Sequence, residues 1–292
     1  MNDVLERSRT WIAERLKPRP PVVAVLRMSG VIGAMGGAGF RRGLTLAALA
    51  PRIERAFKLK RLAAVALAVN SPGGSPVQSA LIAGRIRDLA AEKEVPVHAF
   101  IEDVGASGGY WLAAAGDEIY AQPSSIVGSI GVVSGGFGFT EMIAKLGIER
   151  RLHTAGDRKA MLDPFGPEKP ADVKHLKAIQ KDIHGEFIAM VRARRGDRLK
   201  GTDKELFSGA FWTGGKALDL GLVDGIGEMR AVMRSKFGDD VRFRALDERR
   251  PWWRGRFGLP GGGAGPEPLG ADFAGGLLAA VEERLWWNRF GL

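Results

Sequence analysis

Short runs of branched apolar residues alternate along this chain with longer segments in which apolar positions recur every three or four residues. The first pattern is typical of buried strands and the second of amphipathic helices. The apolar runs predict strands at 22–28, 63–69 and 95–101. The segments that follow the first two predict helices at 44–57 and 76–92. Strands that alternate with helices predict an α/β domain with a largely parallel sheet.

The pattern continues with shorter elements up to about residue 246. We expect strands near 117–121, 130–133 and 148–154. Helices are expected at 140–146 and at about 168–195, the latter long and highly charged. The domain is therefore predicted to run from residue 21 to residue 246.

The two ends of the chain have a different character. Residues 1–20 predict a short amphipathic helix that prolines at 18, 20 and 21 bring to an end. Residues 247–270 are rich in Arg, Gly and Pro and read as a linker. Residues 271–292 predict an aromatic helix, which packs on its own domain or a neighbouring subunit, or contacts a membrane surface or a partner.

Composition excludes several kinds of site. The chain has no cysteine, so disulfides, a thiol nucleophile and thiolate metal sites are excluded. Its four histidines (His98, His153, His175 and His184) are scattered without metal-ligand spacing, so we expect no metal and no cofactor. The net charge of +10 fits a basic soluble protein or one attracted through its termini to an anionic membrane. Aromatic and basic residues do not interleave, which argues against nucleic acid.

No apolar run has the length of a membrane span or of a signal-peptide core. The sequence therefore predicts a cytoplasmic protein, with peripheral attachment to the inner face of the cell membrane left open.

Candidate chemistry lies in two glycine-rich bends that each follow a buried strand. The first is Asn70-Ser-Pro-Gly-Gly-Ser75, where Gly73 and Gly74 leave backbone amides free to stabilise an oxyanion, although a plain turn explains it too. The second is Asp103-Val-Gly-Ala-Ser-Gly-Gly-Tyr-Trp111, where Ser107 stands among small residues at the start of a helix. Ser107 fits a nucleophile on a sharp strand-to-helix bend, or a helix N-cap.

A serine nucleophile needs a base. His98 and His153 are candidates, but neither lies in a neighbourhood that indicates such a role. Lys159 follows a glycine turn and precedes apolar residues. A lysine acts as a base only when it is neutral, which requires burial or a nearby positive charge.

At this point four patches resemble one known family. They are NSPGG at 70–74, ASGGYWLAAAGDEIYAQPSSIVGSIGV at 106–132, TAGDRKAMLDPF at 154–165 and WTGGKALDLGLVDGIG at 212–227. In this order they resemble the signal peptide peptidase A (SppA/SohB-like) family, the S49 serine peptidases. The resemblance implies a Clp protease/crotonase-like fold, with repeated β-β-α units and a largely parallel sheet.

The resemblance also implies roles for particular residues. Ser107 would be the nucleophile, Lys159 the general base, and Ser129 the residue that orients the lysine. The amide of Gly108, with that of Gly74 or Gly73, would form the oxyanion hole. Substrates would be short apolar peptides such as signal-peptide remnants, activity would rise with pH, and the protein would be a homo-oligomer with sites facing an inner cavity.

Some alternatives stay open. Val132, Val133 and Phe137 shape the substrate cleft or belong to the core. A crotonase-like acyl-CoA enzyme would also use two amides as an oxyanion hole. A non-catalytic membrane-associated scaffold would explain the basic charge and the Trp-rich tail. The sequence leaves the natural substrate and the number of subunits undetermined.

Overall fold

The computed structural model describes residues 19–33, 43–246 and 284–291. Its strands are β1 (Val22–Ser29), β2 (Leu62–Ser71), β3 (Val97–Ala106), β4 (Glu118–Ala121), β5 (Ile126–Gly128), β6 (Phe211–Thr213), β7 (Gly225–Ile226) and β8 (Arg242–Ala245). They form one sheet in the order β6-β5-β3-β2-β1-β8, with β4 pairing with β3 and β7. The described pairings are parallel except that of β5 with β6. The predicted α/β class with a largely parallel sheet is confirmed.

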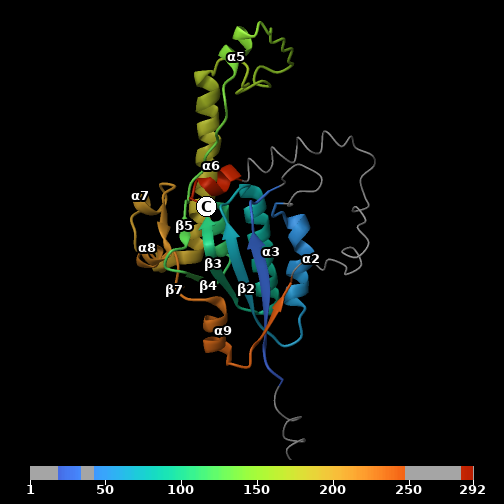
Figure 1. Ribbon diagram of the computed structural model, residues 1–292, viewed down its shortest axis with the longest axis vertical. Helices are drawn as coiled ribbons and strands as arrows, with labels where there is room; N and C mark the ends of the chain where they lie inside the picture. Colours follow the sequence, from blue (N-terminus) through green and yellow to red (C-terminus); the bar gives the residue numbers. More distant parts are fainter. Residues whose placement is uncertain (1–18, 34–42, 247–283, 292) are drawn as a thin grey trace, which may run out of the picture.

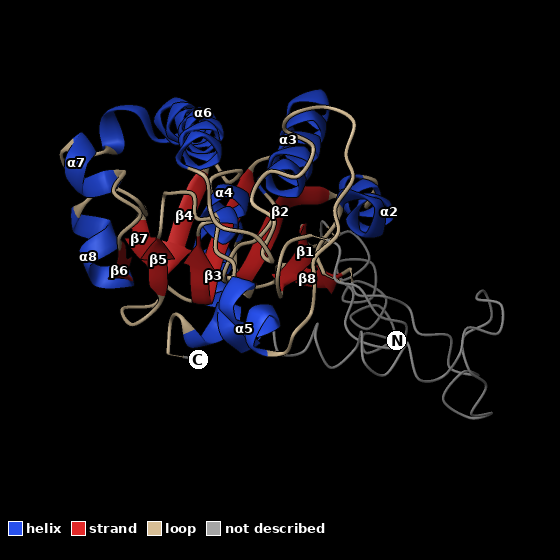
Figure 2. Cartoon of the chain, turned by 90° about the horizontal axis from the view of Figure 1, so that it is seen from above, coloured by secondary structure: helices blue, strands red, loops and turns tan. Residues whose placement is uncertain are grey.

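Helices cover both faces of this sheet. They are α2 (Leu46–Phe57), α3 (Pro76–Lys93), α4 (Gly108–Ala113), α5 (Thr140–Lys145), α6 (Pro170–Arg195), α7 (Asp203–Leu206), α8 (Gly214–Asp219) and α9 (Met229–Phe237), with a 3₁₀ turn at Gly196–Arg198. Helices α2, α3, α4 and α6 pack on one face around the main core (Figure 2). Helix α9 covers the other face. Within the described ranges, none of the helices combines the length and the apolar character that crossing a membrane requires.

Strand β2 shows why the apolar runs were continuous. Val65, Leu67 and Val69 point into the main core, and Ala64 and Ala66 point to the face under α9. Side chains alternate along a strand, so a strand that is buried on both faces has apolar residues at every position.

One part of the chain leaves this compact body. Residues 133–169, together with the N-terminal part of α6, project from the sheet as an arm (Figure 1). Within the arm the Phe139 and Phe165 rings pack on one another, with centroids 5.6 Å apart. The Phe139 amide donates to the Pro164 carbonyl at 2.6 Å, which ties its two ends together.

Two predicted strands are wrong. The strand expected near 130–133 lies earlier, at 126–128, and residues 148–154 lie on the arm without forming a strand. A strand needs a neighbour for its backbone hydrogen bonds, and the described part of the arm has none to offer. Strand β3 is longer than predicted and extends to Ala106.

Some predictions on the termini lie largely outside the described residues. These are the N-terminal helix at 1–20, the linker at 247–270 and the first part of the C-terminal segment. Of the predicted helix at 271–292, residues 284–288 are described and are helical.

Candidate active site

Ser107 occupies the turn between β3 and α4 in a conformation that L-residues rarely adopt. Its φ is 52° and its ψ is −123°. Its amide donates to the Gly128 carbonyl at 2.8 Å, and its carbonyl accepts from the Trp111 amide at 3.1 Å. The backbone is thus held by bonds on both sides. The hydroxyl does not cap α4, so the N-cap interpretation does not explain this serine.

The first glycine bend packs directly against Ser107. A Cβ added to Gly73 would lie 2.7 Å from the Ser107 Cβ and 2.9 Å from the Gly108 nitrogen. Gly73 and Gly74 have φ of +108° and +141°, and a Cβ on Gly74 would lie 2.0 Å from the Ile32 carbonyl oxygen. Both positions therefore require glycine, for backbone conformation and for space.

Two amides at this junction have no acceptor among the described residues, namely those of Gly74 and Gly108. The Gly73 amide donates to Ser71 Oγ at 3.2 Å, a long bond. The amides that the sequence predicted for an oxyanion hole therefore lie beside Ser107, and two of them are free to donate.

Ser129 follows β5 as Ser107 follows β3. The parallel register pairs Ala106 with Gly128, so the two serines leave neighbouring strands at the same level. Ser129 is 3% exposed, has a φ of 52°, and donates its amide to the Ala210 carbonyl at 2.7 Å. Both serines line a cavity of about 330 Å³, together with Gly74.

His184 of α6 lines the same cavity. Its Nε2 lies 3.1 Å from the carbonyl oxygen of Ile130, directly after Ser129. Sequence reasoning counted His184 only as one scattered histidine, because no local signal places α6 beside β5. Val132 and Val133 also line the cavity, and Val133 is 63% exposed, so Val133 does not belong to the core.

Lys159 does not line this cavity. It lies in the segment 156–162 of the arm and is exposed. Within the described part of the chain, its ammonium makes no ion pair or hydrogen bond. A single chain thus brings together Ser107, Ser129 and the glycine amides, while Lys159 stands apart from them.

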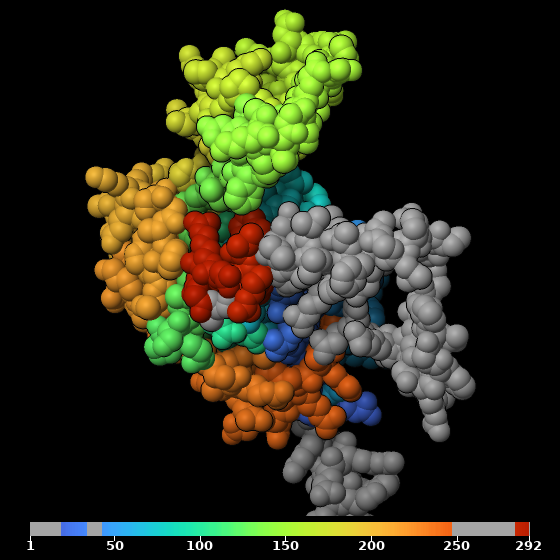
Figure 3. All heavy atoms as spheres, turned by 45° about the horizontal axis from the view of Figure 1, so that its top comes forward, coloured from blue at the N-terminus to red at the C-terminus, as the bar shows by residue number. Residues whose placement is uncertain are grey.

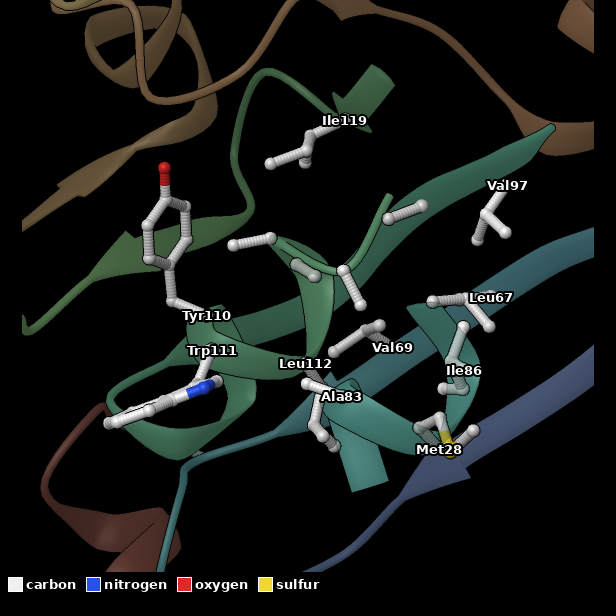
Figure 4. Close-up of a cluster of buried hydrophobic side chains, with 14 of the residues drawn as sticks. Met28, Leu67, Val69, Ala83, Ile86, Val97, Tyr110, Trp111, Leu112 and Ile119 are labelled. Carbon is white, nitrogen blue, oxygen red and sulfur yellow. The ribbon is translucent and has the colours of Figure 1, made fainter. Parts of the chain in front are cut away.

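Helix α4, which follows the serine's turn, is anchored to the core by three consecutive residues. The Trp111 ring stacks on Phe187 of α6 with centroids 4.7 Å apart. Leu112 points into the cluster formed with β2 and α3 (Figure 4). The Tyr110 hydroxyl donates to the Leu222 carbonyl at 2.8 Å, and burial raises the pKa of Tyr110.

A buried ion pair supports the loop that Tyr110 contacts. Arg195 is 2% exposed, and its Nη1 and Nη2 donate to the Asp224 carboxylate at 2.7 and 3.0 Å. The Ile119 amide donates to the same carboxylate at 2.7 Å. Burial works to raise the pKa of Asp224, but the hydrogen bonds of Arg195 and Ile119 and the charge of Arg195 outweigh it and lower the pKa. Nothing in the charged sequence around Arg195 distinguished it from its exposed neighbours.

Comparison with known proteins gives several relatives. A Brucella abortus protein named Na(+)/H(+) antiporter NhaA is 48% identical over 296 residues, which cover 99% of this chain and 40% of that protein. A protein of Enterococcus faecium that bears the SppA name is 33% identical over 58% of this chain and 48% of its own. Serine protease SPPA, chloroplastic, of Arabidopsis thaliana is 29% identical over 73% of this chain and 32% of its own. The chain spans less than half the length of each of these relatives.

Among solved structures, a mutant of the 1510-N membrane-bound stomatin-specific protease is 14% identical, with a TM-score of 0.46 over 79% of this chain and 99% of that one. The family model described as Peptidase family S49 matches residues 90–238, a range that includes Ser107, Ser129 and Lys159. Since this match covers 149 of the 292 residues, the chain belongs to peptidase family S49.

Proposed function

We propose that this protein hydrolyses short apolar peptides, such as signal-peptide remnants, with Ser107 as nucleophile and Lys159 of a second copy as general base. The observation that carries the proposal is the Ser107 turn. A serine whose hydroxyl makes no capping hydrogen bond, in a strained conformation beside two free amides, has the position that a nucleophile requires.

The reaction follows from these positions. Ser107 Oγ attacks the carbonyl carbon of the peptide bond while its proton passes to the neutral lysine. The amide of Gly108, with that of Gly74 or Gly73, donates to the oxyanion that forms. The lysine then protonates the leaving amine, the C–N bond breaks, and an acyl-enzyme remains. Water, deprotonated by the same lysine, releases the acyl group and restores Ser107.

The exposed side chains of the arm support a lysine that comes from another chain. Among the described residues, seven of the thirteen exposed large hydrophobic side chains lie between 133 and 165. They are Val133, Phe137, Met142, Leu146, Ile148, Leu152 and Phe165. Such a concentration of apolar surface is typical of a protein interface. Burial of the arm against another copy would carry its lysine into apolar surroundings, which favour the neutral form that acts as a base.

In this arrangement Ser129 receives the lysine. Ser129 lines the same cavity as Ser107, so its hydroxyl can accept a hydrogen bond from the incoming ammonium or donate one to the neutral amine. Ser129 thereby orients the base towards Ser107.

The test is complementation between two inactive variants. Ser107→Ala and Lys159→Ala are purified separately and then mixed under conditions that allow subunits to exchange. Cleavage of a fluorogenic leucine-rich peptide is followed from neutral to alkaline pH. A base shared between chains predicts that each variant is inactive alone and that an equal mixture recovers about a quarter of the wild-type rate, because random assembly pairs an intact serine with an intact lysine in that share of sites.

Lys145→Ala is the matched control, since it removes another lysine of the arm and should keep wild-type activity. Two results would contradict the proposal. An active Lys159→Ala variant would show that another group, with His184 as the next candidate in the cavity, is the base. An inactive mixture, with exchange verified by differently labelled subunits, would show that the serine and lysine do not come from different copies.

A further inference from the structure

The last described segment, residues 284–291, lies on the face that carries the candidate active site. Two of its residues, Trp286 and Arg289, line the same cavity as Ser107 and Ser129. Figure 3 shows this segment in red, set among the base of the arm, the loops around β6 and the ends of the central strands. The space next to the nucleophile is therefore partly filled by the chain itself.

Phe290 anchors the segment in an apolar site beside the serine. It is 9% exposed and packs against Val104 and Ala106 of β3, and against Ile126 of β5. Its ring meets Phe211 edge to face, with centroids 5.2 Å apart. We call these four contact residues the aromatic seat. Ala106 directly precedes Ser107, so the seat adjoins the nucleophile along the strand.

The segment also lines a second cavity. This cavity of about 730 Å³ is lined by Phe290 together with Ile101 and Met229. A peptide bound across Ser107 occupies the space on both sides of the attacked bond. Trp286 and Arg289 line the Ser107 cavity and Phe290 lines the second cavity, so the segment and a peptide bound across Ser107 compete for this space.

We propose that the aromatic seat binds a large apolar side chain of the peptide substrate, and that residues 284–291 occupy it as an internal competitor. This inference rests on the proposed function, since it assumes that the Ser107 cavity receives peptides. The apparent affinity of a protein for its ligand falls in proportion to the fraction of molecules in which the site is open. The segment therefore weakens substrate binding and leaves the chemical step unchanged.

The experiment measures peptide binding without catalysis. In the full chain with Ser107→Ala, the added change Phe290→Ala removes the ring from the seat. A fluorescein-labelled decapeptide rich in leucine and phenylalanine is titrated, and its anisotropy gives Kd. We expect Phe290→Ala to tighten binding at least about tenfold. Leu285→Ala is the matched control, because Leu285 lies on the same segment but is 58% exposed, and it should leave Kd unchanged.

Arg289→Ala is a second variant that keeps the test valid if Phe290→Ala folds poorly. Arg289 is exposed at its surface and lines the Ser107 cavity, so its loss should also tighten binding without affecting the core. In chains that keep Ser107, KM should fall while kcat stays constant. Weaker binding in both variants would overturn the proposal, because the segment would then be a wall of the substrate site. Unchanged binding in both would also overturn it, because the segment would not compete.

The two proposals fail separately. If Phe290→Ala tightens binding of the decapeptide but no chain cleaves peptide, the proposed catalysis is refuted and the proposal of an internal competitor is supported. If cleavage depends on Ser107 and Lys159 but Phe290→Ala leaves Kd unchanged, the proposed catalysis is supported and the proposal of an internal competitor is refuted.

Discussion

Replacement of Ser107 by glycine, compared with replacement by alanine, tests whether the nucleophile is held under strain. Both variants lack the hydroxyl, so their difference isolates the effect of the Cβ on the backbone. At φ 52° and ψ −123° a residue with a Cβ is disfavoured, and such a conformation costs on the order of 1–3 kcal/mol. Glycine adopts it without that cost, but gives up about 0.5–1 kcal/mol through its more flexible unfolded chain.

The expected balance is that Ser107→Gly is about 1 kcal/mol more stable than Ser107→Ala. In a domain of this size that difference raises Tm by roughly 2–4 °C. The strain persists in the native protein because Gly128 and Trp111 hold the backbone on both sides of the serine. Neither variant should cleave peptide, so the two inactive variants differ only in stability.

Urea and thermal unfolding of the two variants measure this difference. Ser235, on the exposed side of α9, provides the control. In an ordinary helix the Ser235→Gly variant should be about 1 kcal/mol less stable than the Ser235→Ala variant. If the order at Ser107 is the same as the order at Ser235, the turn is not strained and the reasoning is refuted.

Two further predictions concern the surroundings of the site. Gly73→Ala should lower kcat/KM by at least about 10², because its Cβ would lie 2.7 Å from that of Ser107. Steady-state kinetics measure this loss. Gly84→Ala in α3 is the control and should keep full activity, because a Cβ added there meets nothing within 4 Å. Asp224→Asn should destabilise the fold by about 3–5 kcal/mol at neutral pH, because it leaves the buried charge of Arg195 without its partner. The folded-state pKa of Asp224 is lowered, so its contribution is present above the unfolded pKa of about 3.9 and is lost as the pH falls through the folded value. Unfolding in urea across acid pH should therefore show a flatter profile for the asparagine variant, and equally steep profiles would contradict this account.

Local pattern was enough to predict the scaffold of this protein. The buried strands could be recognised because both of their faces are covered, which makes them apolar at every position. The two glycine bends could be recognised because Gly73 and Ser107 each follow such a strand directly. Parallel strands place their carboxyl ends at one edge, so the proximity of these two bends followed from the same pattern. The family resemblance added the roles of Ser129 and Lys159.

Features that depend on contacts between distant segments could not be read in this way. The place of Ser129 beside Ser107 depends on the register of β3 with β5, and the strand itself lies earlier than its apolar residues suggested. His184 reaches the cavity only because α6 packs alongside α4, and Arg195 becomes buried at the far end of that helix. No window of sequence contains both partners of these contacts.

Sequence and tertiary structure differ most in what they indicate about Lys159 and about the C-terminal residues. The chemistry of Lys159 was suggested by its motif, yet the arm holds this residue away from the cavity of its own chain. The aromatic C-terminal residues had several interpretations from sequence, and for the described residues 284–291 the packing of Phe290 beside Ala106 shows a contact with their own domain. Residue types and local periodicity determine which groups are available and which elements form. Only the packing of those elements decides which groups meet, because the free energy of each such contact depends on surfaces that lie far apart in the chain.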